Sequence, residues 1–189
     1  MDFIVEATSG KKGTGKDYRT LQSYLADPVG SVIVAFADWV KTHRYALGDE
    51  DAFSAEKSAA TRANLIATGT EQRQKFGDAY YVLQMLGFIE LQRSRGMRRV
   101  LIPDLRFEVE FLYLTATAAQ GKFTLLLYRM EAPERNRLRI ERESGGDVNL
   151  GRQLAEDRSE TELDVISKQS GLFQIVWNDP LSQTTVQVG

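Results

Sequence analysis

The chain has 189 residues and a formal net charge of −2, and 42% of its residues are hydrophobic and 26% charged. These values predict one globular domain with a sizeable core, and they give no overall positive charge that would attract nucleic acid. The absence of cysteine excludes disulfides, thiol catalysis and cysteine-bound metal, and a single histidine argues against a histidine-based metal site or catalytic triad.

No segment of the sequence is typical of membrane insertion or export. The apolar runs all fall short of the ~20 residues that a membrane-spanning helix needs. The N-terminal residues Met-Asp-Phe-Ile-Val-Glu lack the basic flank and the cleavage site of a signal peptide. We therefore expect a cytoplasmic protein without a membrane partner. A nucleic-acid partner is not favoured, although a local basic patch could still bind one.

Short apolar runs alternate with amphipathic stretches along the chain. Apolar, β-branched runs predict strands, and apolar residues spaced three and four apart predict helices. In chain order we predict a strand at 3–7, helix 16–26, strand 31–36, helices 39–47, 54–68 and 71–91, strand 98–103, helix 109–119, strand 123–128, helix 131–143 and strand 172–177. Ser54 is the expected N-cap of the helix at 54–68, Gly69 its expected end, and Gly77 marks a turn.

This alternation predicts an α/β fold with three layers and a mostly parallel sheet, because the strands are too apolar to have a face in water. Ligands of such folds bind at the carboxyl ends of the strands. Three polar segments follow predicted strands there: the glycine-rich stretch 8–17, Asp38, and Asp104 with Arg106.

The glycine-rich stretch fits most of the phosphate-loop pattern, which is Gly, four residues, Gly, Lys and then Ser or Thr. Gly10, Gly15 and Lys16 match, and Asp17 stands where the hydroxyl residue belongs. Such a loop directs backbone N–H groups and a helix N-terminus at an anion, while the lysine neutralises phosphate. The alternative is a solvated basic turn. We predict a nucleotide site formed by Gly10, Lys11, Lys12, Gly13, Thr14, Gly15, Lys16, Asp17 and Tyr18.

Asp17 offers a hard oxygen that could bind Mg²⁺ directly or through water. Its alternative role is that of a favourable acid at a helix N-terminus. Asp104 could hold the metal or the acceptor, and Arg106 could grip phosphate bidentately. For both, a structural ion pair is the alternative. Lys16 is the predicted contact to the β- and γ-phosphates.

The loop 10–18 resembles that of the bacteriophage deoxynucleoside monophosphate kinases and of the related animal-type phosphomevalonate kinases, which carry Gly-Lys-Asp at this point. Further segments resemble the phage enzymes in the same order: 36–41, 69–80, 103–110 and 159–164. Trp39 replaces a proline of the phage pattern, Arg158 stands where many phage members have histidine, and 174–176 replaces an acidic-aromatic start of the last strand.

The resemblance implies a nucleoside monophosphate kinase-like, P-loop NTPase fold, with a single domain over residues 1–189 and a helical lid at about 129–158. It also implies ATP and Mg²⁺ as cofactors, a small-molecule nucleotide as partner, and transfer of the γ-phosphoryl to a deoxynucleoside monophosphate. Such an enzyme would work in the cytoplasm of a bacterial or phage-infected cell, with a homodimer as an open possibility. Three alternatives remain: phosphomevalonate as acceptor, a hydroxymethylated base in DNA as acceptor, or a nucleotide-binding module without catalysis.

Other charged residues are candidates for the acceptor and the lid. Arg73, Lys41 and Asp38 could bind the acceptor, with simple solvation as the alternative. Arg135, Arg139 and Arg142 lie on one helical face and resemble lid arginines that offset transition-state charge; alternatively they pair with neighbouring glutamates. Gly145 and Gly146 could form a lid hinge or a plain turn. Trp39, Tyr80 and Tyr81 could stack a base but are better explained as core, and His43 as a half-buried helix residue.

Overall fold

The computed structural model describes residues 2–54, 56–156 and 161–178. Five strands form one sheet in the order β2-β3-β1-β4-β5, and every neighbouring pair is parallel. The strands are β1 (Ile4–Gly10), β2 (Ser31–Ile33), β3 (Arg99–Ile102), β4 (Thr124–Glu131) and β5 (Phe173–Trp177). The mostly parallel α/β sheet predicted from the sequence is therefore confirmed.

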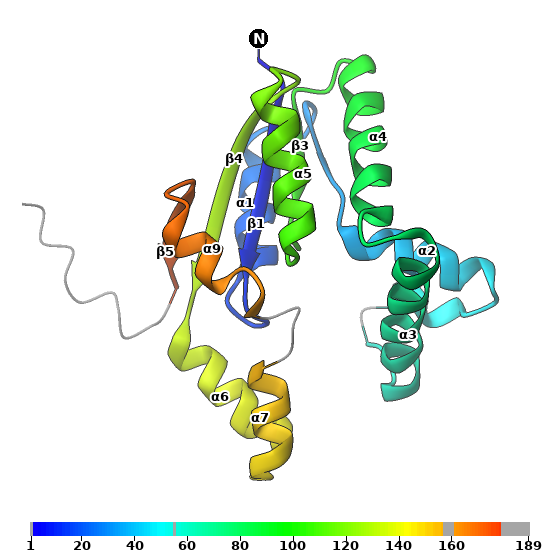
Figure 1. Ribbon diagram of the computed structural model, residues 1–189, viewed down its shortest axis with the longest axis vertical. Helices are drawn as coiled ribbons and strands as arrows, with labels where there is room; N and C mark the ends of the chain where they lie inside the picture. The colour runs from blue at the N-terminus through cyan, green and yellow to red at the C-terminus, as the bar shows by residue number, and fades with distance from the viewer. Residues whose placement is uncertain (1, 55, 157–160, 179–189) are drawn as a thin grey trace, which may run out of the picture.

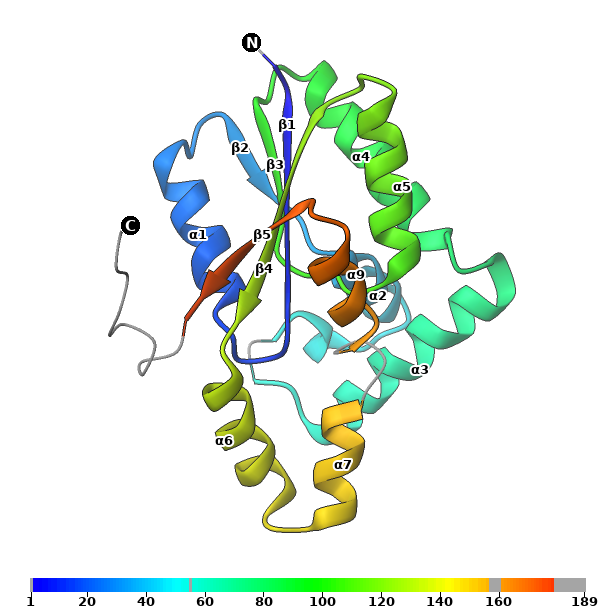
Figure 2. The same ribbon diagram turned by 60° about the vertical axis from the view of Figure 1, so that its left-hand side comes forward.

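Helices cover both faces of the sheet and extend beyond one end of it (Figure 1). They are α1 (Lys16–Ala26), α2 (Phe36–Ala46), the 3₁₀ helix η1 (Glu50–Phe53), α3 (Ala59–Phe76), α4 (Tyr80–Ser94), α5 (Glu108–Ala119), α6 (Pro133–Ser144), α7 (Val148–Glu156) and α9 (Asp164–Gln169). Figure 2 shows α1 on one face and α4, α5 and α9 on the other. The resulting layers are compatible with a three-layer fold of the P-loop NTPase kind.

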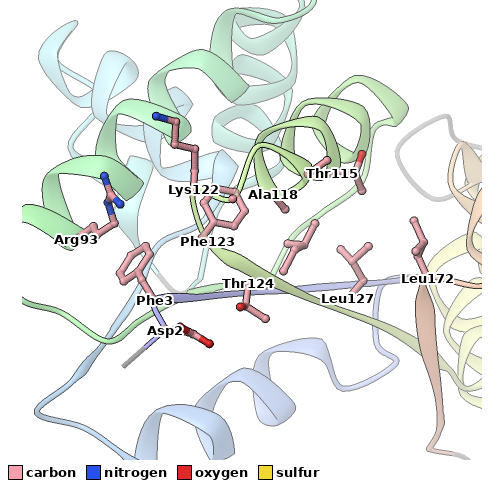
Figure 3. A pocket seen from close by; sticks show the side chains of 13 residues that line it. Asp2, Phe3, Arg93, Thr115, Ala118, Lys122, Phe123, Thr124, Leu127 and Leu172 are labelled. Atoms are coloured by element: carbon pink, nitrogen blue, oxygen red, sulfur yellow. The ribbon is translucent and has the colours of Figure 1, made fainter.

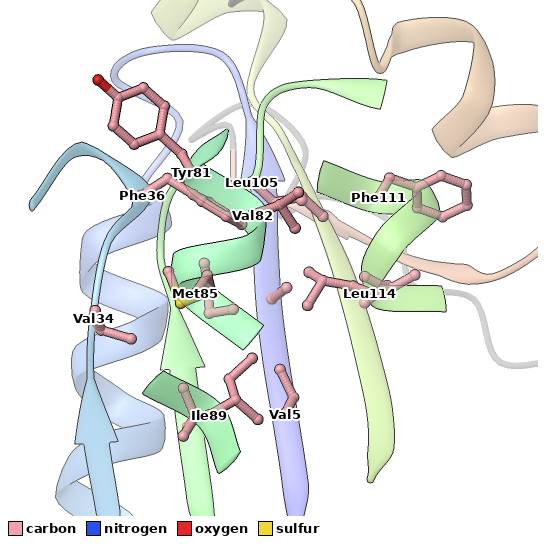
Figure 4. Packing of buried hydrophobic residues seen from close by; sticks show 14 of the residues in the cluster. Val5, Val34, Phe36, Tyr81, Val82, Met85, Ile89, Leu105, Phe111 and Leu114 are labelled. Atoms are coloured by element: carbon pink, nitrogen blue, oxygen red, sulfur yellow. The ribbon is translucent and has the colours of Figure 1, made fainter. Parts of the chain in front are cut away.

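The main core lies between the sheet and helices α4 and α5. Val5 of β1 and Val100 of β3 are fully buried, as are Val82 and Met85 of α4 and Leu114 of α5. Figure 4 shows Val5, Val82, Met85 and Leu114 in one cluster, to which Val100 also belongs. Because both faces of the central strands are covered, their sequences are largely apolar, and this is the signal that predicted them. The charged exception in β1 is Glu6, which is buried and pairs with Arg19 of α1. None of the helices in the described ranges is long and apolar enough to cross a membrane.

The strand predicted at 31–36 is too long. β2 ends at Ile33, and Phe36 already begins α2 three residues before the predicted helix start. The cause lies far away in the sequence: the carboxylate of Asp104 accepts hydrogen bonds from the backbone N–H groups of Phe36 (2.7 Å) and Ala37 (2.9 Å). These two N–H groups have no partner inside their own helix, so the carboxylate stabilises a helix start at this point.

The helix predicted at 54–68 is also misplaced. α3 begins at Ala59, where the hydroxyl of Ser58 rather than Ser54 caps it by accepting from the N–H of Thr61 at 3.0 Å. The helix then continues through Gly69 and ends before Gly77, which has a φ of 93°. A glycine inside a helix costs only about 1 kcal/mol relative to alanine, which neighbouring packing offsets here.

The C-terminal third differs from prediction at its helix ends. Glu131 belongs to β4, and the charged helix α6 starts at Pro133. The first residue of a helix has no partner for its N–H within the helix, so a proline there loses no hydrogen bond. Helices α7 and α9 were not predicted. Ser159, which belongs to the segment 159–164 that resembles the phage enzymes, and Arg158, where the sequence departs from their pattern, lie outside the described residues.

Candidate functional site

The glycine loop lies where sheet geometry places a ligand. It connects the carboxyl end of β1 to the first turn of α1. β1 and β4 are neighbours, but the chain leaves β1 toward β2 on one side and leaves β4 toward β5 on the other. Neighbouring strands with opposite exits leave a crevice between their connections, which is the usual ligand site of parallel sheets.

Glycine is required at Gly10 for two reasons. Its φ is 141°, a conformation that other residues rarely adopt. A Cβ atom there would also lie 2.6 Å from the carbonyl oxygen of Met130 on β4. Gly15 has a φ of 96°, and a Cβ there would fall on the side-chain amide of Asn178, which donates to the carbonyl of Thr14 at 2.9 Å.

Lys16 folds back over this loop. It is the first residue of α1, and only 8% of it is exposed. Its Nζ atom donates to the carbonyl oxygens of Gly10 (2.6 Å) and Lys11 (2.7 Å). The ammonium group is therefore held at the centre of the loop, beside the positive end of α1, where both charges attract an anion.

The two lysines at the tip of the loop connect it to different helices. Lys11 pairs with Asp164 of α9 at 3.3 Å, and Lys12 pairs with Glu143 of α6 at 2.7 Å. The lysine charges are thus partly balanced by carboxylates from segments more than 130 residues away in the sequence. An anionic ligand on the loop would compete with these carboxylates.

Arg129 is a site residue that sequence reasoning did not assign beyond placing it at the start of the lid. It is 2% exposed near the end of β4. Its guanidinium donates to the hydroxyl of Ser9 and to Glu131, each at 3.1 Å, and also pairs with Asp164. A single arginine therefore joins β1, β4 and α9 beside the loop. The only sequence signal for it was a charged residue directly after an apolar strand.

Helix α6 lies against the loop through one of its predicted arginines. Arg139 is 7% exposed, and its Cδ atom is 3.8 Å from the position that a Cβ on Gly13 would occupy. It donates to Asn136 at 3.0 Å and pairs with Glu143 at 3.4 Å. Arg135 and Arg142 are exposed. A cavity of about 380 Å³ between the loop, α6 and α9 is lined by residues that include Thr14, Asn136, Ile140 and Lys168.

The predicted acceptor residues of α2 are tied to each other. Asp38 accepts from the N–H of Ala35 at 2.9 Å and from Lys41 at 2.7 Å. Asp104 has both carboxylate oxygens on the N-terminus of α2, and burial raises its pKa. Its role as a metal ligand stays a prediction, and any bound metal would share these oxygens with two backbone N–H groups.

Arg73 of α3 lies near two aromatic rings, those of Tyr81 on α4 and Phe107 just before α5, which we call the aromatic box. Its guanidinium carbon is 4.3 Å from the ring centre of Phe107 and 5.0 Å from that of Tyr81. One of its nitrogens is 3.8 Å from Oε1 of Glu110. Glu110 was part of the matched segment 103–110 but had no predicted role. Its position three residues after Phe107 at a helix start is typical of a side chain that caps the helix.

Glu110 is a buried carboxyl group at the base of this box. It is 2% exposed, and Oε2 accepts from the N–H groups of Arg106 (3.0 Å) and Phe107 (3.1 Å). Burial raises the pKa of Glu110 to about 8; nearby Asp104 adds to the rise, while the backbone N–H groups and Arg73 oppose it. The structure thus places Arg73, Arg106 and Asp104 around one buried acid near the end of β3.

Asp17 and Tyr18 are exposed in the first turn of α1. Within the described ranges, no three acidic or histidine side chains gather into a group that could hold a metal alone. Mg²⁺ that travels with a nucleotide needs only one or two carboxylates besides phosphate oxygens, so Asp17 fits this donor set.

Of the predicted aromatic residues, Tyr81 belongs to the buried core cluster, and Trp39 and Tyr80 pack against it. Trp39 meets Phe88 edge-on at 6.0 Å, and Tyr80 stacks on Phe76 at 4.9 Å. Tyr81 is 2% exposed, and its hydroxyl has no hydrogen-bond partner among the described residues. His43 lies 3.3 Å from the amide of Gln72.

A larger cavity, of about 1000 Å³, lies near the other end of the sheet, at the amino ends of β1 and β4. Figure 3 shows it lined mainly by apolar side chains, among them Phe3, Phe123, Leu127 and Leu172. Its charged lining residues are Asp2, Arg93 and Lys122, and the glycine loop and Lys16 are not part of its lining. The seven-residue length of β1 separates it from the loop by about 20 Å.

A scan against protein-family models found no match to this chain, and a search of curated proteins found no significant match.

Proposed function

We propose that this chain is an ATP-dependent phosphotransferase that moves the γ-phosphoryl group to a deoxynucleoside monophosphate. The observation that carries the proposal is the glycine loop at the carboxyl end of β1, with the Lys16 ammonium held over it and the arginine-bearing helix α6 packed on its outer side. Together these features would supply a cradle of N–H groups, a central cation and a cover.

The donor end is the loop itself. Its backbone and the N-terminus of α1 would bind the phosphates, and Lys16 would turn from the carbonyls of Gly10 and Lys11 toward the phosphate oxygens. Mg²⁺, when bound with ATP, would neutralise charge on the β- and γ-phosphates, and Asp17 would hold it directly or through water. Arg139 lies close enough to the loop to face charge that develops there.

The acceptor end is proposed to lie along the carboxyl ends of β2 and β3. Arg73 and Arg106 would bind the acceptor phosphate, and Asp38 with Lys41 would help to orient it. Helices α6 and α7 pack against each other and project beyond the strands (Figure 1), so they could close over the reacting groups and exclude water.

Coupled measurement of ADP release tests the proposal. The wild type would be assayed with ATP, Mg²⁺ and each deoxynucleoside monophosphate in turn, and then with phosphomevalonate and hydroxymethylated DNA. We expect release that depends on one or more monophosphates and that falls ~100-fold or more in Lys16→Ala, because one preorganised charge contact commonly contributes that much. Lys122→Ala, an exposed lysine at the opposite end of the sheet, is the matched control.

The other outcomes separate the alternatives. Release only with DNA or only with phosphomevalonate would move the acceptor assignment while keeping the phosphotransferase. Tight ATP binding with no release for any acceptor would sink the proposal and favour a nucleotide-binding module.

A further inference from the structure

We propose that Glu110 is a positioning residue: it holds Arg73 in an aromatic box so that the guanidinium presents a fixed edge to the acceptor's phosphate. This inference rests on the proposed function, since it assigns Arg73 to the acceptor. Glu110 itself is not proposed to touch substrate.

Two aromatic rings and a carboxyl group surround the Arg73 side chain. Its guanidinium is flanked by the rings of Phe107 and Tyr81 and faces Glu110 at 3.8 Å. An arginine side chain has about 2 kcal/mol of rotamer entropy to lose, and two aromatic rings with a carboxyl group beside them keep it in one orientation before a ligand arrives. The Arg73 side chain is still 22% exposed, so part of it remains accessible.

One carboxyl group, that of Glu110, contacts two parts of the box. Oε1 of Glu110 faces Arg73, whereas Oε2 binds the N–H groups of Arg106 and Phe107. The second set of contacts fixes the backbone that carries the Phe107 ring. Glu110 therefore aligns the arginine and one of the rings flanking it from a single buried position.

The box also contains a polar group that could still form a hydrogen bond. The Tyr81 hydroxyl is buried without a hydrogen-bond partner in the described part of the chain, which is costly unless something binds it. In Figure 4 this hydroxyl points away from the core. A phosphate monoester held by Arg73 would bring acceptor oxygens to this region.

Steady-state kinetics with Glu110→Ala, Glu110→Gln and the control Glu108→Gln test the inference. Glu108 is an exposed carboxylate in the same helical turn. We expect Glu110→Ala to raise the KM for the acceptor ~10-fold or more with little change in the KM for ATP. Glu110→Gln should fall between Ala and wild type, because its amide oxygen keeps one contact. Equal changes in both KM values would overturn the inference, since general loss of structure affects both sites.

A spectroscopic readout separates this inference from the proposed function. The Nε–Hε resonance of Arg73, assigned with Arg73→Lys, should be shifted by the two rings in the wild type and move to the position of solvated arginines in Glu110→Ala. An unshifted wild-type signal, or an unchanged one in Glu110→Ala, would show that Glu110 does not position Arg73. If the signal behaves as expected but no acceptor is phosphorylated, the positioning stands and the proposed reaction fails.

Discussion

At the scale of single residues, Gly10 combines a backbone conformation with a close approach. Its φ of 141° disfavours any side chain, and the carbonyl of Met130 would lie 2.6 Å from a Cβ atom. Both effects act at the start of the loop, where β1 still pairs with β4. The loop can therefore keep its shape only if this position has no side chain.

We expect Gly10→Ala to lower the free energy of unfolding by about 2–6 kcal/mol, because backbone strain and overpacking each cost ~1–3 kcal/mol. Gly146→Ala is the control, since Gly146 has a φ of 89° but, among the described residues, no atom within 4 Å of the position that a Cβ atom would occupy. Gly146→Ala should therefore lose only the part of the unfolding free energy that comes from backbone strain. Urea denaturation measures both variants, and equal losses would contradict the close approach at Gly10.

Glu110 should make stability fall as the pH rises. Its carboxyl has a pKa of 4.5 in the unfolded chain and about 8 when buried. Because the folded state holds the proton more tightly, the stabilising contribution is complete below pH 4.5 and is lost as the pH rises through 8. The loss is at most about 5 kcal/mol, at 1.36 kcal/mol for each pKa unit.

Unfolding free energies at pH 5 to 9 check this expectation. The wild type should lose stability relative to Glu110→Gln across this range, because glutamine has no proton to release. Glu108→Gln should follow the wild type. A constant difference between wild type and Glu110→Gln would mean that the carboxyl titrates outside this range.

Sequence reasoning identified the loop residues because their signal is local: glycines at fixed spacing before a lysine. It could not assign Arg129 or Glu110 in the same way. Arg129 acquires its role by meeting Asp164 from 35 residues further along the chain, and Glu110 by meeting Arg73 from another helix. Burial of a charged residue is a property of the packed structure, and the identity of one charged residue in the sequence does not predict it.

At the scale of elements, the start of α2 depends on a side chain from the end of β3. Asp104 provides both oxygens to the first N–H groups of the helix. Removing this carboxylate leaves two buried or partly buried donors without a partner, and bonds to a charged group contribute about 1.5–3 kcal/mol. If Asp104 caps α2, removing it lowers stability even without metal. A role as metal ligand alone would leave the metal-free stability unchanged.

We expect Asp104→Ala to lower the metal-free unfolding free energy by roughly 2–4 kcal/mol, and Asp104→Asn by less because one acceptor oxygen remains. Thermal or urea unfolding in the presence of a chelator measures this directly. Unchanged metal-free stability combined with lost Mg²⁺ dependence of activity would instead support Asp104 as a metal ligand.

Element ends were predictable only where local chemistry sets them. The boundaries of α1 and α5 agree with the sequence because a glycine loop and Gly121 lie beside them. The start of α2 and the passage of α3 through Gly69 were mispredicted, since distant side chains and packing against other elements override weak local preference there.

At the scale of the whole molecule, the sheet order brings the site together. β1 lies at the centre with β3 and β4 on either side, so the loop after β1, the residues after β3 and the start of α6 after β4 come to one end. The alternation of elements predicted the parallel sheet, but this strand order was not deduced, because apolar patterning does not say which strands are neighbours.

The central place of β1 also affects how the chain is made. Both neighbours of β1 come late: β3 begins at Arg99 and β4 ends at Glu131. At ~5–20 residues per second of synthesis, the first strand is made roughly 4–18 s before any of β3 exists. During that time the backbone edges and apolar side chains of β1 have none of their final strand partners, so a newly made N-terminal fragment is a natural client for chaperones.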